Sequence, residues 1–415
     1  MQTFASLRRH RNYRLYFTGQ LVSQIGTWLQ TAAQSWLVLD LTHSAIAVGV
    51  VSFCFYGPYA VLGLLGGALA DRVSRHRLMM ATQGAMALCA AALALIVFLH
   101  VDRVWVIDLI AVIRGVVLVF NNPSRQALMV QLVGRGELAN AIALNSGLNN
   151  ATRIVGPGIA GVLIATVGTG WCFALNAVSY LAVIAALGAM REHEFHPTPG
   201  IQRRTPLLRS IADGLRYARK TKTITVVLAM LLVISLFAIN FNVLLPVLAR
   251  QTLHGGPQVY GLIAASFGAG AFIGALIVAS RERASPRVLL AAACGFGAAQ
   301  IGLAFERSTL GDALVLVVVG VCYTLYTAST NALVQLATPG FLQGRIGGLY
   351  SYVFLATGPF GALLVGWLSE RGGTDLAFLV GGIGTLVMVV FGLATRPWPM
   401  PTGTLRARRR ATTSS

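Results

Sequence analysis

The chain has 415 residues and a composition that excludes an ordinary water-soluble protein. Only 11% of the residues are charged, 56% are hydrophobic, and the formal net charge is +19. Soluble domains, by contrast, carry roughly 25% charged residues. Apolar runs of about 20 residues, each long enough to cross a hydrocarbon core, recur along the whole sequence. These features indicate an integral membrane protein.

Taken in chain order, the apolar runs predict twelve membrane-spanning segments. Each segment must be helical, because backbone polar groups in lipid have no water to bond. The first segment follows a basic start, but its apolar run is too long for a cleaved signal peptide, so we expect a retained helix. The spans are expected at 13–38, 45–69, 78–99, 104–123, 140–167, 171–190, 224–249, 258–280, 288–305, 312–334, 346–368 and 376–395.

The longest hydrophilic interruption, residues 191–222, divides the chain into two halves. We expect an amino-terminal six-helix bundle over 1–190, a cytoplasmic linker over 191–222, a carboxy-terminal six-helix bundle over 223–396 and a basic cytoplasmic tail over 397–415. Within the linker, Leu208, Ile211 and Leu215 recur at helical spacing among basic residues. That pattern predicts an amphipathic helix at the membrane surface.

The basic residues predict the orientation. With the amino terminus inside, only Arg103, Arg250, Arg307 and Arg371 lie outside and two arginines lie within spans, whereas the rest of the 32 Lys and Arg residues are cytoplasmic. This is the positive-inside pattern. It predicts a multi-pass protein of the inner (plasma) membrane with both termini in the cytoplasm. Because the charge is scattered over short loops, we expect contact with lipid head groups and no nucleic-acid partner.

No motif for covalent or metal chemistry is present in the sequence. The five cysteines fall in apolar spans without CxxC spacing, and neither GxxxxGK[ST] nor HExxH occurs. We therefore expect no enzyme activity, no metal and no cofactor. An ATP-driven pump would need a nucleotide site that this sequence lacks.

The two halves repeat each other in the same order. Gln131-Leu132 corresponds to Gln335-Leu336, Gly156-Pro157 to Gly358-Pro359, and Asp108 to Asp312. Several ordered matches indicate a duplicated six-helix unit. Paired repeats with a substrate site between them are typical of transporters that work by alternating access.

Two motifs resemble those of a known superfamily. The loop GALADRVSRHR resembles the G-x-x-x-D-R-x-G-R-R signature of the major facilitator superfamily, with Ser74 in place of the usual glycine and His76 in place of a basic residue; its matching positions are Gly67, Asp71, Arg72, Arg75 and Arg77. The fifth span resembles the antiporter motif of that superfamily's drug and metabolite exporters, with Thr152 at one glycine position; its matching positions are Gly147, Gly156, Pro157 and Gly161.

Further stretches, including NPSRQA, RIVGP and NVLLPVLAR, resemble the enterobactin-exporter-like branch, also called transmembrane secretion effectors, with macrolide-efflux proteins as near relatives. This resemblance implies the major facilitator fold: all-α, with twelve transmembrane helices in two bundles. It also implies a monomeric secondary exporter of a siderophore or secondary metabolite, driven by an ion gradient and expected to be a proton antiporter. Asp71 would lie near the start of the eleventh span, around 343–345, and stabilise the outward-facing state.

Three charged residues lie within predicted spans. Arg114 and Arg153 are mid-span, where a charge costs roughly 2.5–3.5 kcal/mol, so a role in the cavity or in coupling is expected. Bonding to carbonyl groups of a neighbouring helix is the alternative. Asn145, Asn149 and Arg153 form one helical stripe. Asp108 could carry a coupling proton or could mark the water boundary, and its angular offset from Arg114 argues against a pair.

Two deep positive charges without a deep negative one predict a small-molecule cargo that is neutral or anionic and partly aromatic. Uncharged candidates for the cavity lining are Gln24, Trp28, Thr31, Asn240, Asn242, Tyr323 and Tyr326. Broad drug or macrolide efflux is the alternative within transport, followed by nutrient import. A non-transporting membrane receptor is the alternative from another class, although it would not need paired repeats or buried arginines.

Overall fold

The computed structural model describes residues 5–70, 74–134, 136–196, 207–281, 285–339 and 342–395, and the regular elements in these ranges are helices, without any strand. The first half contains α1 (Ala5–Arg9), α2 (Arg11–Thr42), α3 (Ala45–Ala70), α4 (Arg75–Phe98), α5 (Val104–Val133), α6 (Leu138–Thr166) and α7 (Thr169–Gly188). A short 3₁₀ turn, Glu192–Glu194, follows.

The second half begins with α8 (Leu207–Lys220) in the predicted linker. It continues with α9 (Lys222–Phe237), α10 (Phe241–Val247), a π-helical turn η2 (Leu248–Thr252), α11 (Pro257–Ser280), α12 (Pro286–Phe305), α13 (Thr309–Leu336) and α14 (Gln343–Thr395). The predicted seventh span thus consists of α9, α10 and η2, and the eleventh and twelfth spans are both contained in α14.

Two of these helices depart from regular geometry. Between α9 and α10, the Asn240 side chain donates hydrogen bonds to the carbonyl oxygens of Ser235 at 3.1 Å and Leu236 at 3.3 Å. Carbonyl groups freed by a helix break need such partners in lipid. Helix α14 bends at Gly372 and Gly373, and Gly373 adopts a φ of 68°, which a residue with a side chain rarely adopts.

Nine helical stretches of the described residues are long and apolar enough to cross a membrane. Together they account for ten of the predicted spans, since α14 contains two. Helices α2 and α6 are the exceptions because of their polar residues: α2 buries Gln20 and Gln30, and α6 carries Asn149 and Arg153. These two helices pack against each other. Helices too polar to face lipid are expected to turn a polar face toward the interior of the protein.

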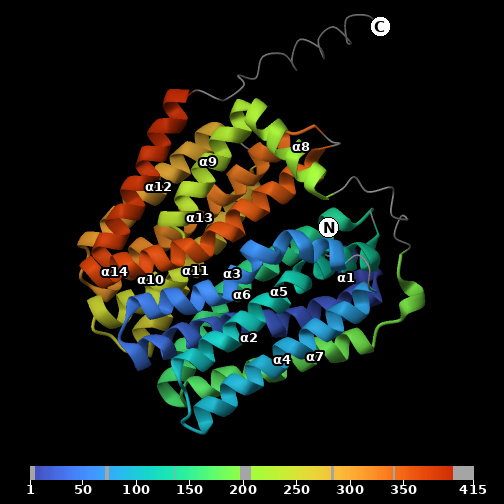
Figure 1. Ribbon diagram of the computed structural model, residues 1–415, viewed down its shortest axis with the longest axis horizontal. Helices are drawn as coiled ribbons and strands as arrows, with labels where there is room; N and C mark the ends of the chain where they lie inside the picture. Colours follow the sequence, from blue (N-terminus) through green and yellow to red (C-terminus); the bar gives the residue numbers. More distant parts are fainter. Residues whose placement is uncertain are drawn as a thin grey trace, which may run out of the picture.

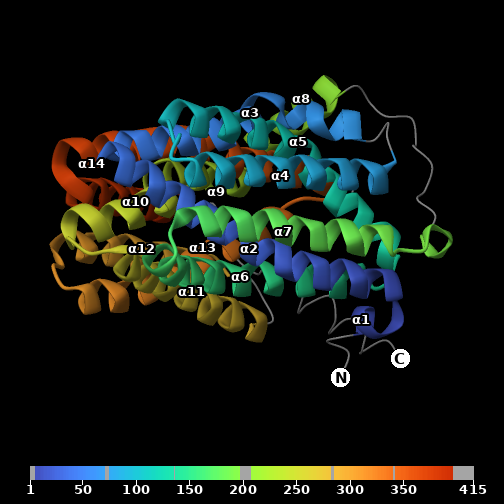
Figure 2. The same cartoon turned by 90° about the horizontal axis from the view of Figure 1, so that it is seen from below.

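The molecule is elongated, and its two ends differ. One end carries α1 and the turn Glu192–Glu194, and we call it the linker end; the other carries the bend of α14, and we call it the distal end (Figure 2). At the distal end, α10 and α14 of the second half lie beside α2 and α3 of the first (Figure 1). Toward the linker end the two sets of helices diverge (Figure 1).

Glycines allow the halves to pack closely along two helix pairs, α3 with α14 and α6 with α11. A Cβ atom placed on Gly161 would lie 2.5 Å from the Cα of Gly261, and one placed on Gly49 would lie 2.6 Å from the carbonyl oxygen of Ala362. Both distances are too short for real atoms. Small residues at such crossings let helix backbones approach in a membrane.

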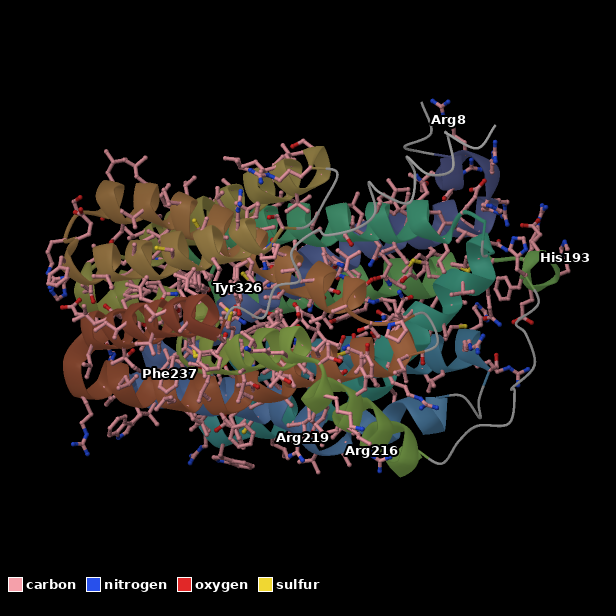
Figure 3. All side chains as sticks on the ribbon, turned by 90° about the horizontal axis from the view of Figure 1, so that it is seen from above. Arg8, His193, Arg216, Arg219, Phe237 and Tyr326 are labelled. Atoms are coloured by element: carbon pink, nitrogen blue, oxygen red, sulfur yellow. The ribbon has the colours of Figure 1, made fainter. Side chains whose placement is uncertain are left out.

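Helix α8 lies against the second half through one face. The Tyr217 hydroxyl donates a hydrogen bond to the carbonyl oxygen of Ala337 at 3.1 Å, and Ala218 is buried. Arg216 and Arg219 extend outward from the same helix (Figure 3). The linker thus contains a helix in which Ala218 is buried, while Leu215, Arg216 and Arg219 are exposed; its place at the membrane surface stays a prediction.

Candidate functional site

A cavity of about 520 Å³ lies between the two halves. Its wall is built by α2 to α7 on one side and by α9 to α11, α13 and α14 on the other. This volume lies within the range of sites for small organic molecules. The residues of the first half form what we call the N wall, and those of the second half form the C wall.

The N wall is polar and positively charged. Its arginines are Arg114 and Arg125 of α5 and Arg153 of α6. Around them lie uncharged polar side chains, namely Gln20, Gln24, Gln83, Asn121, Asn122 and Asn149. Among the described residues, no Asp, Glu, Lys or His lines the cavity. The site therefore presents positive charge without a carboxylate to balance it.

Arg114 is buried and held on two sides. Its Nη1 atom donates a hydrogen bond to Oε1 of Gln34 at 2.6 Å, and its guanidinium carbon lies 4.8 Å from the centre of the Phe55 ring. Its Nε atom is buried and has no hydrogen-bond partner within the described part of the chain. Because both partners are neutral, the charge of Arg114 persists in the cavity.

Arg153 connects the two walls through aromatic rings. Its guanidinium carbon lies 4.9 Å from the ring centre of Trp28 in the N wall and 5.4 Å from that of Tyr323 in the C wall. Such cation–π contacts are worth about 0.5–2 kcal/mol each. They orient the guanidinium but leave its N–H donors available to an acceptor.

The C wall is mainly aromatic and aliphatic. Phe241 packs against Phe267 with 4.5 Å between ring centres, and Tyr323 lies 5.7 Å from Phe267. Phe354 and Leu355 of α14 extend the apolar surface. The polar members of this wall are few; they include Ser235, Asn240 and Asn242 at the break between α9 and α10. This wall can bury the apolar body of a ligand.

The structure brings together most of the residues that the sequence nominates for the cavity. Its lining includes Gln24, Trp28, Thr31, Arg114, Asn149, Arg153, Pro157, Asn240, Asn242 and Tyr323. Gln24 Nε2 donates to Oδ1 of Asn149 at 2.7 Å, which links α2 to the polar stripe of α6. Of that stripe, Asn145 does not line the cavity.

Two further candidates lie outside the cavity. Tyr326, labelled in Figure 3, is fully buried in the second half, and its hydroxyl has no hydrogen-bond partner among the described residues. Asp108 is half-buried near the distal end of α5, with a buried Oδ1 atom that lacks a hydrogen-bond partner in the described ranges. The hydrogen bond that Arg114 makes is with Gln34 rather than with Asp108.

Arg125 lines the cavity although the sequence analysis assigned it to a cytoplasmic loop. The fourth span was expected to end at 123, whereas α5 continues to Val133. The extra turns carry Arg125 into the cavity wall together with Asn121 and Asn122. The i, i+4 spacing of Asn121 and Arg125 was the sequence signal that could have revealed this polar face.

Two glycines of the antiporter-like motif act in helix packing. Gly156 faces the Cβ atom of Trp28 on α2, and Gly161 faces Gly261 on α11, so any side chain at either position would collide. Gly147 has open space around its Cα atom. Pro157 lines the cavity. The motif thus places α6 between α2 of its own half and α11 of the other.

The loop signature lies partly outside the described residues. Asp71 and Arg72 belong to the undescribed segment, so the proposed contact of Asp71 with the start of α14 stays a prediction. Gly67 lies in the last turns of α3, Arg75 is the first residue of α4, and Arg77 is exposed on that helix.

Polar contacts join the halves at the distal end. Arg250 Nη2 lies 3.1 Å from Oδ1 of Asp40, and Gln251 Nε2 donates to the carbonyl oxygen of His43 at 3.1 Å. Trp36 of the first half stacks on Tyr260 of the second with 5.6 Å between ring centres. In this structure the distal side of the cavity is therefore closed by contacts between the halves.

Comparisons with known proteins agree with this architecture. The model of the transmembrane secretion effector family matches residues 1–410. The chain is 25% identical to the staphyloferrin A transporter of Staphylococcus aureus, covering 92% of this chain and 96% of the relative. It is 24% identical to macrolide efflux protein A of Streptococcus pyogenes, covering 92% and 96%. Its identity to the multidrug efflux pump Tap of Mycolicibacterium fortuitum is 28%, covering 89% and 92%.

Solved structures show the same fold at low sequence identity. The nucleoside transporter NupG superposes with a TM-score of 0.73 at 11% identity, covering 94% of this chain and all of that one (100%). A bacterial homologue of the lysosomal transporter Spinster gives 0.73 at 12%, covering 95% and 99%. Fold and relatives are those of membrane transporters and not of enzymes. The chain belongs to the transmembrane secretion effector family of the major facilitator superfamily.

Proposed function

We propose that this protein is a secondary active exporter of a small amphipathic organic anion, similar to a siderophore or secondary metabolite. The observation that carries the proposal is the unequal cavity: three arginines on the N wall, an aromatic C wall, and no acidic residue among the described lining residues. The cargo would place its anionic group on the N wall and its apolar body on the C wall.

Electrostatics support an anionic cargo. Arg114 is 3% exposed and its hydrogen-bond partner is a neutral amide, so its charge is buried without compensation. Buried charges are costly unless they are paired. At an effective dielectric constant of 20, two unit charges 4 Å apart interact by about 4 kcal/mol. An anion in the cavity gains an interaction of this order, and a cation suffers the opposite one.

The geometry of arginine supports recognition of a carboxylate or a similar anion. A guanidinium presents a planar fork of N–H donors that matches a carboxylate with two parallel hydrogen bonds. Arg153 is oriented for this by the rings of Trp28 and Tyr323. A ligand bound there would contact both halves at once, as a transporter that rocks its halves around the cargo requires.

Export by alternating access is the proposed direction. The basic residues of the linker-end segments favour placing this end in the cytoplasm. In that orientation the distal contacts close the outer side, and the cavity would receive cargo from the cytoplasm. The names of macrolide efflux protein A and the multidrug efflux pump Tap support an efflux role.

An ion gradient, with protons as the coupling ion, is the proposed energy source. The sequence carries no phosphate-binding motif for ATP, and the resemblance to antiporters favours protons. Asp108 is the first residue to test as proton carrier, because its buried Oδ1 atom has no hydrogen-bond partner in the described part of the chain. Asp108→Asn is expected to uncouple cargo movement from an imposed proton gradient.

Broad-specificity efflux of drugs or macrolides is the second candidate. The aromatic C wall, built by residues such as Phe241, Phe267 and Tyr323, favours it, because apolar surfaces accept many shapes. In that case the N wall would contribute solvation and helix packing rather than selection by charge. The two candidates differ in whether the charge of the cargo decides its transport.

Uptake into inverted membrane vesicles with an imposed proton gradient tests the proposal. The two cargos are a catecholate siderophore and a lipophilic cationic dye, measured with the wild type and Arg153→Ala. The matched control is Arg103→Ala, because the wild-type Arg103 is an exposed arginine at the distal end of α5. We expect gradient-dependent uptake of the catecholate alone, lost in Arg153→Ala and retained in Arg103→Ala. Dye uptake equal to or greater than that of the catecholate would instead establish the second candidate.

A further inference from the structure

The distal end contains a contact that the sequence motifs do not describe. Glu370, at the end of the first part of α14, extends from the second half to the first turn of α3. Its Oε2 atom accepts hydrogen bonds from the backbone N–H of Ala45 at 2.7 Å and of Ile46 at 3.4 Å, and from the Ser44 hydroxyl at 3.1 Å. A single carboxylate oxygen thus caps a helix that belongs to the other half.

The first turn of α3 is prepared for this contact. The Ser44 hydroxyl accepts a hydrogen bond from the Ala47 backbone N–H at 3.3 Å while it donates to Glu370. The earliest N–H groups of a helix have no partner within the helix, and the N-terminus carries a partial positive charge. From the other half, the Glu370 carboxylate supplies both an acceptor for these N–H groups and a negative charge beside the positive helix end. Its hydrogen bonds to α3 therefore exist only while the distal end is closed.

Close backbone packing surrounds the contact on the same helix pair. A Cβ atom on Gly366, one turn before Glu370, would lie 2.8 Å from the carbonyl oxygen of Ala45. Two glycine contacts, Gly49 with Ala362 and Gly366 with Ala45, therefore bring α3 and α14 together at the depth at which Glu370 reaches the helix start. Without this approach the carboxylate could not span the gap.

We propose that Glu370 is a positioning residue of the transport cycle, which holds the distal gate closed by capping α3 of the opposite half. The gate opens when these hydrogen bonds break and α3 exchanges the carboxylate for water. The Asp40–Arg250 pair supports the same closed state from the neighbouring helices. Its side chains are 51% and 42% exposed and Glu370 is exposed as well, so solvent weakens both contacts.

This role rests on the proposed alternating access but not on the identity of the cargo. Glu370, at the end of the first part of α14, meets the start of α3 at the distal end. Because these hydrogen bonds can form in only one arrangement of the halves, they favour two discrete access states.

Distance measurement by pulsed electron paramagnetic resonance tests the proposal on the purified full chain. Spin labels are attached to Val101→Cys and Leu310→Cys after the five native cysteines are replaced. Both positions are exposed, at 53% and 69%, and lie at the distal ends of opposite halves. Glu370→Ala is compared with the matched control Arg371→Ala, whose side chain is positioned over the Trp367 ring 5.4 Å away and makes no contact with α3 in the described residues.

We expect Glu370→Ala to raise the ratio of distal-open to distal-closed molecules about twofold to fivefold, in line with an exposed carboxylate at a helix N-terminus. Glu370→Gln and Ser44→Ala should produce smaller shifts in the same direction, and they decide the question if Glu370→Ala does not fold. A distance distribution in all three variants that matches Arg371→Ala would overturn the proposal. Because the distance measurement needs no cargo, it can contradict the role of Glu370 while the vesicle experiment supports anion export. Equally, it can support the role of Glu370 while the vesicle experiment contradicts anion export.

Discussion

The two walls of the cavity differ more than the two halves of the fold do. The N wall carries Arg114, Arg125 and Arg153 among amide side chains, whereas the C wall consists mainly of rings and aliphatic groups. Both halves descend from the same repeat pattern, so the scaffold does not require this difference. It indicates that one half selects the cargo by charge and the other provides apolar surface, while Arg153 joins the two through Trp28 and Tyr323.

The most severe way to break this asymmetry is Arg153→Glu. A negative charge in place of a positive one turns an attraction of about 4 kcal/mol into a repulsion. We expect initial rates of catecholate uptake into vesicles to fall at least about a hundredfold and uptake of the cationic dye to rise. Arg153→Gln removes the charge without reversing it. Its rate of catecholate uptake should lie between those of the wild type and Arg153→Glu. Unchanged cargo preference in Arg153→Glu would show that the N wall does not select by charge.

Removal of an aromatic ring from the C wall should have a smaller and less selective effect. Tyr323→Ala deletes the ring that contacts both Phe267 and the Arg153 guanidinium. We expect rates to fall about tenfold, which corresponds to the loss of an aromatic pair and a cation–π contact. Tyr323→Phe keeps the ring and should transport nearly as the wild type does. An effect confined to anionic cargo would contradict the assignment of apolar contact to this wall.

Arg125→Gln tests whether the third arginine belongs to the selecting surface. Arg125 lines the cavity at intermediate exposure, so its interaction with an anion is more strongly screened than that of Arg114. We expect the KM for the catecholate to rise about threefold, with little change in the maximal rate. Arg103→Gln, at an exposed position next to the distal end of α5 and outside the cavity, is the control. Equal effects in the two variants would exclude Arg125 from the site.

Removal of the Arg9–Glu137 ion pair, which lies outside both walls, should have the smallest effect on transport. Burial raises the pKa of Glu137, but the hydrogen bond from Arg9 and the charges of His10 and Arg9 outweigh it and hold the pKa below its usual value. The pair therefore stabilises the fold above the unfolded-state pKa of about 4.3, and this contribution is lost as the pH falls through the lowered folded pKa.

Thermal unfolding as a function of pH measures this contribution. The wild type should be slightly more stable than Glu137→Gln near pH 7, and the difference should shrink as the pH falls below the unfolded-state pKa of about 4.3 and vanish below the lowered folded pKa. Transport at neutral pH should be the same in both proteins, since Glu137 does not line the cavity. A change of cargo preference in Glu137→Gln would mean that charge outside the cavity also contributes to selection.

Apolar runs made most of the fold predictable, and the departures have physical causes. The predicted ends lie close to the observed ones for spans such as 78–99, observed as Arg75–Phe98, because lipid thickness sets helix length. The fourth span was predicted ten residues too short because Arg125, which ended the apolar run, lines a cavity within the longer helix. The break before α10 depends on a side-chain bond from Asn240 that hydropathy cannot reveal.

The site was predictable where periodicity and charge agree. Asn149 and Arg153 share a helical stripe and both line the cavity. Tyr326, one turn from Tyr323, was nominated only as an uncharged polar residue, and it faces the interior of its own half, where it is fully buried. Glu370 could not be found from sequence, because its partners are backbone N–H groups 324 to 325 residues away and carry no residue signature.

Calorimetric titration of the purified protein with a matched pair of ligands tests the central claim most directly. The pair is 2,3-dihydroxybenzoate and its methyl ester, which share a ring and hydroxyls but differ by one negative charge. We predict that the carboxylate binds at least about tenfold more tightly and that Arg153→Gln abolishes the difference. Equal affinity for both ligands, or tighter binding of the ester, would contradict selection of the cargo by charge on the N wall.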